Sequence, residues 1–314
     1  MVSIGTPMVA NWTGTAATAE PTRVERRRAI SDTEFRSQYL HPRRPVILEG
    51  AAAAWPILRH GSPDDFRRAF ADHPVRLLGA SLRLSELLDV LERSTPERPA
   101  PYPCKYEIAK DFRELLDGVT PRLACSLPDR QENPLLPRAL FDGVNNLEIF
   151  FGGPGGRFPY LHYDVMHLHA WITQLHGDKE FTLYSPKQEE FLYVNANVPW
   201  QSAIRNHHNV DHAAYPLFRN ARPLKVILRA GETLFIPCGW WHTARSLTMT
   251  ISVAFDQLGP DNWGEFVADA VATRRREGRA ASALLLRAYL AAIGPILTLW
   301  ERLGGGRSMR WGER

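Results

Sequence analysis

Cysteine is scarce in this chain of 314 residues, which contains only Cys104, Cys125 and Cys238. An odd number of cysteines cannot form a complete disulfide framework, and the chain offers no paired thiolates for a structural zinc site. Such cysteine usage is typical of proteins from a reducing compartment. We therefore expect a cytoplasmic protein.

The chain also lacks an excess of charge of one sign, since 38 Lys and Arg face 34 Asp and Glu for a net charge of +4. This balance predicts no nucleic-acid or membrane partner. We see no charged segment followed by an apolar one, so we expect no secretory signal. The longest apolar stretch, residues 280–300, is interrupted by Arg287 and Gly294-Pro295, so we expect a buried or dimer-forming helix rather than a membrane span.

The chain divides into four parts by composition. Residues 1–22 are rich in Ala and Thr and are expected to be disordered. Residues 23–260 are expected to form one domain, with helices over 64–70 and 85–91 and a proline-rich loop before its central part. Residues 261–303 are predicted to be C-terminal helices, and residues 304–314 a loose tail.

Short runs with strand character dominate the middle of the chain. They are separated by Gly, Pro and Asp turns, and they cover residues 170–175, 179–185, 224–228, 233–237 and 248–255. Many short strands at close spacing are typical of a double-sheet jelly roll. The predicted fold is therefore mostly β, a double-stranded β-helix (jelly-roll, cupin) core with flanking N-terminal and C-terminal helices.

Two motifs carry candidate metal ligands. His162 and Asp164 are two residues apart, so in a strand both side chains point to the same face, and His242 follows much later after Trp240-Trp241. Two imidazoles and one carboxylate form the facial triad that binds Fe(II) and leaves positions open for other ligands. We predict that His162, Asp164 and His242 bind iron and are the catalytic residues.

The region from about residue 150 to 257 resembles the JmjC/cupin-like oxygenases that depend on Fe(II) and 2-oxoglutarate, the family of asparaginyl and lysyl hydroxylases. The similarity extends over roughly residues 25 to 260. The motifs that carry it are the Gly-Pro-Gly turn at 153–155, His162-x-Asp164, the Gly-x-Lys turn ending at Lys179, the run 230–237 and Trp240-Trp241-His242.

The resemblance implies Fe(II) as cofactor, 2-oxoglutarate as co-substrate, O₂ as oxidant, and Lys179 as the cation that binds the far carboxylate of 2-oxoglutarate. Two positions depart from the family pattern, because Pro159 replaces a hydroxyl residue and Ala254 replaces an Asn. Tyr160, Thr173 or Thr182 could substitute as hydrogen-bond partners of the co-substrate, and we name Tyr160 and Thr173 as candidates.

Other histidines are weaker candidates for a role in the site. His167 and His169 are out of phase with His162 in an unbroken strand, which indicates packing, or an orienting role if the strand bends. Asn206-His207-His208-Asn209 is typical of a solvated loop. The long segment 195–222 could face the substrate.

The leading hypothesis is a dioxygenase that hydroxylates an unactivated C–H bond on a peptide or protein side chain. A hydroxylase of small molecules, such as an amino acid or a natural-product precursor, is the first alternative. A non-catalytic metal-binding cupin and a hydrolase or isomerase that uses another divalent metal are further alternatives. The resemblance also implies a homodimer formed through the C-terminal helices.

Overall fold

The computed structural model describes residues 21–306 and 311, apart from residues 29, 143, 145 and 146. The predictions of a disordered segment over residues 1–22 and of a loose tail over 304–314 fall mostly outside the described residues and stay predictions.

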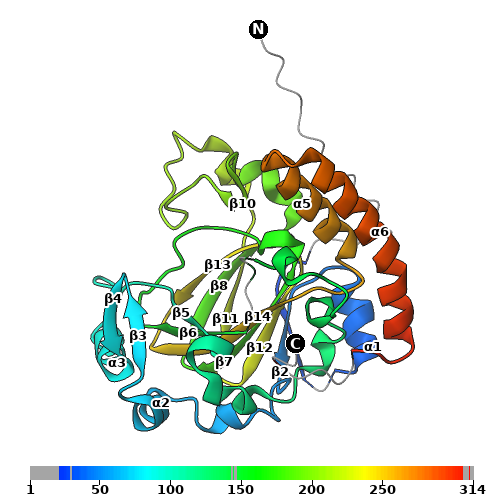
Figure 1. Ribbon diagram of the computed structural model, residues 1–314. Coiled ribbons are helices and arrows are strands. Elements are labelled where there is room, and N and C mark those ends of the chain that lie inside the picture. The colour runs from blue at the N-terminus through cyan, green and yellow to red at the C-terminus, as the bar shows by residue number, and fades with distance from the viewer. Residues whose placement is uncertain (1–20, 29, 143, 145–146, 307–310, 312–314) are drawn as a thin grey trace.

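Two β-sheets packed face to face form the core of the described chain (Figure 1). The large sheet has the strand order β1 (Glu25–Arg28), β2 (Val46–Glu49), β12 (Glu232–Ile236), β7 (His169–His176), β14 (Thr250–Gln257), β6 (Glu148–Gly152) and β5 (Cys104–Glu107). The small sheet has the order β11 (Leu224–Leu228), β8 (Lys179–Tyr184) and β13 (Trp241–Ser246). These strands confirm the predicted jelly-roll core.

An extended segment, residues 157–163, lengthens the small sheet beyond β13. Arg157 pairs with Arg245, and His162 pairs with His242 on one side and with Gln201 on the other. Gln201 lies in β10 (Val198–Ser202), which pairs with β9 (Val194–Asn195), while β3 (Pro74–Leu77) and β4 (Ala80–Arg83) form a separate hairpin. The long segment 195–222 therefore begins directly beside the predicted metal ligands.

Alternation of side chains divides the large sheet into two apolar faces. On the inner face Ile172 and Leu234 pack against Phe181 of the small sheet. On the outer face Trp171 and Phe235 pack against the N-terminal helices. Strand β7 is therefore buried on both sides, which hides its alternation in the sequence.

The N-terminal helices cover the outer face of the large sheet. They are α1 (Asp32–Phe35), α2 (Pro63–Phe70), α3 (Leu84–Glu92) and α4 (Ile108–Asp111). Helix α2 begins where predicted because Ser62 and Asp65 form a reciprocal capping box and Pro63 occupies the first turn. Phe66 of α2 then packs edge-on against Phe151 of β6, with ring centroids 5.2 Å apart.

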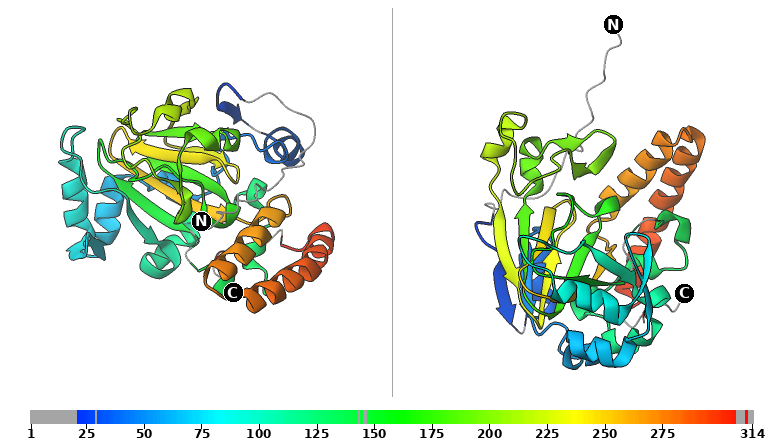
Figure 2. Two further views of the ribbon diagram at one scale, coloured as in Figure 1. Left: turned by 90° about the horizontal axis from the view of Figure 1, so that it is seen from above. Right: turned by 90° about the vertical axis from the view of Figure 1, so that its left-hand side faces the viewer.

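The two predicted C-terminal helices are α5 (Trp263–Arg276) and α6 (Ala280–Arg302), which lie against each other on one side of the sheets (Figure 2). Arg130, 2% exposed, anchors α6 through two bonds to the Glu301 carboxylate, at 2.7 and 2.9 Å, and one to Thr298. By length and composition, α6 is also the one helix of the described chain that could cross a membrane.

Replacing Glu301 with Ala should lower the free energy of unfolding by about 3–5 kcal/mol, because it leaves the Arg130 guanidinium buried without its counter-charge. Urea denaturation measures this loss. Glu277→Ala is the matched control, since Glu277 is 45% exposed and its ion pairs with Arg274 and Arg279 are 3.7 and 3.5 Å long. That control should lose less than about 1 kcal/mol, and an equal loss in both variants would contradict the anchoring role of Arg130.

Candidate functional site

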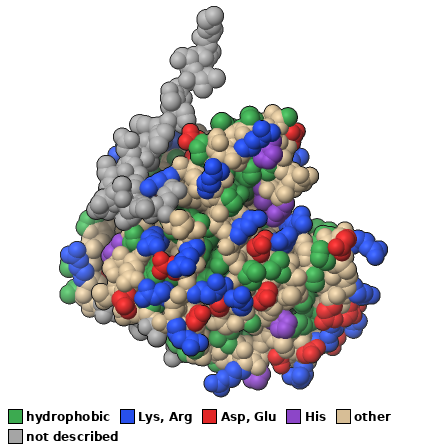
Figure 3. Space-filling model, turned by 180° about the vertical axis from the view of Figure 1, so that it is seen from behind, with side chains coloured by type: hydrophobic (Ala, Val, Ile, Leu, Met, Phe, Trp, Pro, Cys, Tyr) green, Lys and Arg blue, Asp and Glu red, His purple; other side chains and the backbone are tan. Residues whose placement is uncertain are grey.

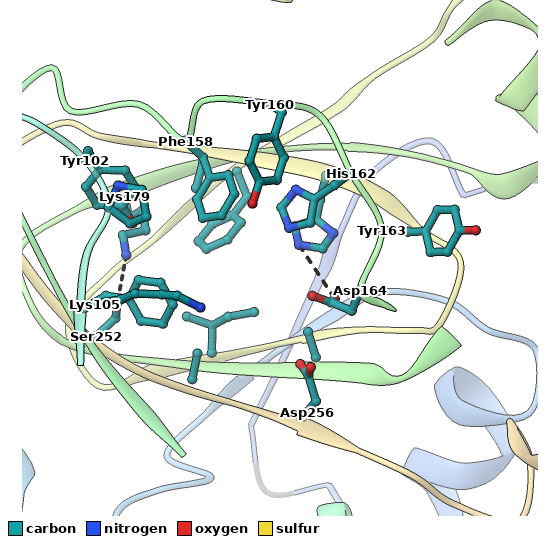
Figure 4. Close-up of a pocket in the computed structure, with 18 of the residues that line it drawn as sticks. Tyr102, Lys105, Phe158, Tyr160, His162, Tyr163, Asp164, Lys179, Ser252 and Asp256 are labelled. Atoms are coloured by element: carbon teal, nitrogen blue, oxygen red, sulfur yellow. Dashed lines mark hydrogen bonds and ion pairs between the residues drawn. The ribbon is translucent and has the colours of Figure 1, made fainter. Parts of the chain in front are cut away.

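A cavity of about 240 Å³ lies between the two sheets. Its walls come from β7, β8, β13, β14 and the extended segment 157–163 (Figure 4). The residues that line it include Tyr102, Lys105, Phe150, Phe158, Tyr160, His162, Asp164, Ile172, Lys179, Phe181, Trp200, His242, Ser252, Ala254 and Asp256. Most of the predicted site residues therefore meet in one place.

His162, Asp164 and His242 converge at one end of this cavity. Each offers a ligand atom, and these atoms all lie within 4.8 Å of one another. The Nε2 atom of His242 is 3.7 Å from a carboxylate oxygen of Asp164, and the two imidazole rings are 4.4 Å apart at their centroids. The structure thus brings together the three residues that the spacing of the two motifs selected.

The protonation of these groups suits a divalent cation. Burial lowers the pKa of His162 well below its usual value, and the neighbouring His242 lowers it further, so the imidazole is neutral. Burial raises the pKa of Asp164 although His242 opposes this shift. A cation held by this carboxylate would offset that effect of burial.

The Nδ1 atoms of the two imidazoles differ in their hydrogen-bond partners. The Nδ1–H of His242 donates to the Trp240 carbonyl at 3.0 Å, which turns Nε2 toward Asp164. The Nδ1 atom of His162 is buried and has no partner among the described residues. An unpartnered buried nitrogen beside a carboxylate and a second imidazole fits a metal-binding site.

Lys179 lies on β8 at the other end of the cavity and is only 2% exposed. Its Nζ atom donates to Ser252 Oγ at 2.6 Å and lies over the rings of Tyr102 and Phe150, 5.5 and 5.6 Å from their centroids. No carboxylate of the described residues forms an ion pair with it. Burial lowers the pKa of Lys179 to about 7. A carboxylate that entered this end of the cavity would therefore find an ammonium group without a counter-ion.

The two other predicted co-substrate contacts have different outcomes. Tyr160 lines the cavity, and its hydroxyl points into it beside His162 (Figure 4). Thr173 does not line the cavity: it faces the opposite side of β7, where its hydroxyl bonds to Thr233 at 2.9 Å. The prediction for Thr173 was wrong because Ile172, one residue earlier, takes the inward position. Ala254 presents a methyl group to the cavity, and Pro159 is exposed.

His167 and His169 bind carboxylates of the C-terminal region. His167 Nδ1 is 2.7 Å from Asp269 in α5, and His169 Nε2 is 2.7 Å from Asp261. The backbone N–H of Cys238 donates to His169 Nδ1 at 2.9 Å. Both imidazoles thus connect the sheets to the segment that leads into α5, which is the packing role rather than an orienting one.

Several residues of the cavity were not selected from the sequence. Trp200 of β10, for example, closes one side. Lys105, by contrast, follows the proline-rich loop at a position where the family resemblance suggests pocket residues; it lines the cavity and pairs with Glu148 at 3.0 Å. Asp256, 4% exposed, lies at the far end of the row that begins with Ser252 and Ala254. The two-residue period of β14 could have identified Asp256, whereas no local signal could have placed Trp200.

Replacing Lys179 with Met should raise the free energy of unfolding near neutral pH. The folded chain binds the Lys179 proton with a pKa of about 7 against an ordinary 10.5, so unfolding takes up a proton between these values. The penalty of the buried ammonium is complete below about pH 7 and disappears as the pH rises toward 10.5. Unfolding free energies of both proteins should therefore converge at high pH. The exposed Lys110→Met is the control, and a pH-independent difference would contradict the assignment.

The chain is similar to several known proteins. The chain is similar to lysine-specific demethylase 8 of Xenopus tropicalis, with 28% identity over 70% of this chain and 49% of the relative. It is also similar to the 2-oxoglutarate and iron-dependent oxygenase JMJD4 of Gallus gallus, with 24% identity over 84% of this chain and 67% of the relative. The human tRNA wybutosine-synthesizing protein 5 is 28% identical over 73% of this chain and 76% of its own length.

The chain spans about half the length of lysine-specific demethylase 8 and of several other relatives that it matches. The model of the family described as "Cupin-like domain" matches residues 80–256, which contain the candidate metal ligands and Lys179. This chain belongs to the cupin-like domain family, whose JmjC members it resembles throughout that region.

Proposed function

We propose that this protein is an Fe(II)- and 2-oxoglutarate-dependent dioxygenase that hydroxylates an unactivated C–H bond. The observation that carries the proposal is the presence, in one cavity, of the His162–Asp164–His242 cluster and the buried ammonium of Lys179, which forms no ion pair with a described carboxylate. A site for a metal alone would not require the lysine. A non-catalytic scaffold would have no use for this arrangement, because burying a lysine is unfavourable.

Each residue has a role in this proposal. His162, Asp164 and His242 hold the iron, and Lys179 binds the far carboxylate of 2-oxoglutarate with Ser252 orienting its ammonium group. Bound iron and 2-oxoglutarate supply the oxidising chemistry, with O₂ as the oxidant. The hydroxyl of Tyr160 is placed to donate a hydrogen bond in the cavity. The apolar walls, among them Phe158 and Phe181, limit access of water.

The proposed substrate is a peptide or protein side chain. A cavity of about 240 Å³ is at the small end for ligand sites, so it has room for the co-substrate and one side chain rather than a large free molecule. Two of the similar proteins are named for lysine demethylation and for tRNA wybutosine synthesis, so macromolecular substrates occur among the relatives. A small amino acid or natural-product precursor is the second candidate, favoured by the same small volume.

Purified protein with Fe(II), ascorbate and 2-oxoglutarate should form succinate. His162→Ala should abolish this activity because it removes a ligand, and Lys179→Met should reduce it by about two orders of magnitude or more through loss of a charge-assisted contact. His41→Ala, a change of an exposed histidine, is the control. Absence of succinate, together with no anaerobic binding of 2-oxoglutarate, would support the non-catalytic alternative. Activity that survives in the Lys179→Met variant would support a different metal enzyme.

A cytoplasmic homodimer is part of the proposal. Cys104, Cys125 and Cys238 form no disulfide, which is consistent with a reducing compartment. Helix α6 exposes a row of large apolar side chains, namely Leu284, Leu285, Tyr289, Ile296, Leu299 and Trp300, with exposed fractions from 38% to 72%. Contiguous apolar surface of this kind is uncommon on a monomer, so we assign it to a second copy of the chain.

The double variant Leu285→Glu/Leu299→Glu should be a monomer when the wild type is a dimer, because it places two carboxylates in the apolar row. Sedimentation velocity measures the change in mass. Leu78→Glu is the matched control, since Leu78 is 87% exposed on the β3–β4 turn and should leave the dimer intact. A wild type that sediments as a monomer would refute the dimer without affecting the proposed chemistry.

A further inference from the structure

The strands that direct metal ligands into the cavity direct their neighbouring side chains to the opposite face of the small sheet. On this outer face Arg157 and Arg245 are paired across neighbouring strands, so their side chains lie side by side. In the adjoining row, Thr243 of β13 and Lys225 of β11 are both opposite Thr182 of β8. Three cations, Arg157, Arg245 and Lys225, therefore lie on the outer face of the small sheet and its extension.

Positive charge exceeds negative charge at this place. Arg245 pairs with Glu180 at 3.0 Å, whereas Arg157 and Lys225 form no ion pair with a carboxylate of the described residues. Like charges repel one another, and gathering them without counter-ions is unfavourable. Figure 3, which views the molecule from behind, shows histidines beside several Lys and Arg side chains on this side of the molecule.

Two histidines of the segment 195–222 complete the group. The rings of His207 and His208 are 4.1 Å apart at their centroids. Burial, together with nearby positive charge that includes Arg157, lowers the pKa of both to about 4, so at neutral pH each ring is uncharged and carries one N–H. His207 is half-buried rather than fully solvated as the sequence predicted, because the segment folds back toward the small sheet.

Several hydrogen-bonding atoms of this group of residues have no partner among the described residues. They are Thr243 Oγ1, Arg245 Nε and both ring nitrogens of His207, all buried and without a bond to any described residue. Thr243 is only 1% exposed. Each such group left unsatisfied is costly, on the order of 1–3 kcal/mol. Thr243 Oγ1, Arg245 Nε and one ring nitrogen of the neutral His207 can donate, so an acceptor would satisfy three of these four atoms.

We propose that the outer face formed by Arg157, Arg245, Lys225, Thr243, His207 and His208 is a binding site for a phosphate group. Guanidinium, ammonium, imidazole and hydroxyl donors on one face match the oxygens of a multivalent oxyanion, and Arg157, Arg245 and Lys225 are all near enough to act electrostatically on His208. Arg binds phosphate in two-pronged geometry. The site lies on the other side of the strands from the iron cavity. It is independent of the proposed oxygenase activity.

Occupation of this site would connect strands that carry the metal ligands. Arg157 belongs to the same extended segment as His162, and Phe158 N–H donates to the Ala244 carbonyl at 2.9 Å. A phosphate bound by both Arg157 and Arg245 would bridge this segment and β13. This pair of strands would then bind an anion on its outer face and a metal on its inner face.

Titration of the full chain with inorganic phosphate at constant ionic strength tests the site, with calorimetry for affinity and the ring resonances of His207 and His208 for location. We expect saturable binding that moves both sets of resonances. The double variant Arg157→Gln/Lys225→Gln should weaken it by about tenfold or more. Arg59→Gln, at an exposed arginine outside the group, is the matched control and should bind as the wild type does. Arg157→Lys should retain part of the affinity because it keeps the charge.

Three outcomes would overturn the proposal: no saturable binding, equal binding by the double variant, or binding lost only in Lys179→Met, which would locate the anion in the cavity. Binding that persists in His162→Ala and Lys179→Met would separate the site from the iron centre, whether or not the protein is an oxygenase. A second titration with O-phosphoserine identifies the source of the phosphate. Tighter binding than inorganic phosphate indicates a group carried by a larger ligand, and weaker binding indicates free phosphate.

Discussion

The backbone pairing of His162 with His242 is the constraint on which the candidate site depends. The His162 N–H donates to the His242 carbonyl at 3.1 Å, and the His242 N–H donates back to the His162 carbonyl. This reciprocal pairing sets two residues far apart in the chain directly opposite each other. Because Asp164 follows His162 by two residues on the same segment, its carboxylate reaches the same point. Without this register the three ligand atoms would not meet.

The cavity next to this pair of histidines has its ionisable groups at opposite ends. The three metal ligands lie at one end, and Lys179 lies at the other with Ser252 as its hydrogen-bond partner. Phe150, Ile172 and Phe181 provide apolar walls between them. A ligand with carboxylates at both ends and a short apolar middle fits such an arrangement, which is how the structure relates the fold to the proposed co-substrate.

Two carboxylates, one just before α5 and one in its middle, tie the C-terminal helices to the segment that follows Asp164. Asp261 binds His169 and Asp269 binds His167, and both histidines follow shortly after the His-x-Asp motif. Positive backbone φ angles at Met166 and His167, 63° and 50°, produce the bend that makes this possible. The segment next to the ligands is therefore held from the side of α5, and α6 in turn is anchored through Arg130 and Glu301.

The sequence by itself determined the residue types of the site, the strand runs and the capped helices, because these depend on local spacing and on side-chain chemistry. His162, Asp164, His242 and Lys179 could be selected in this way, with the family resemblance supplying the role of Lys179. The tertiary structure alone decided that Thr173 faces away from the cavity, since β7 is buried on both faces and its sequence carries no alternation. It also decided that Lys179 is buried away from water and that Trp200 and Asp256 line the cavity. The pairing of strands likewise places Arg157 beside Arg245. These properties follow from strand register and burial, which arise from contacts between distant parts of the chain and leave no local pattern in it.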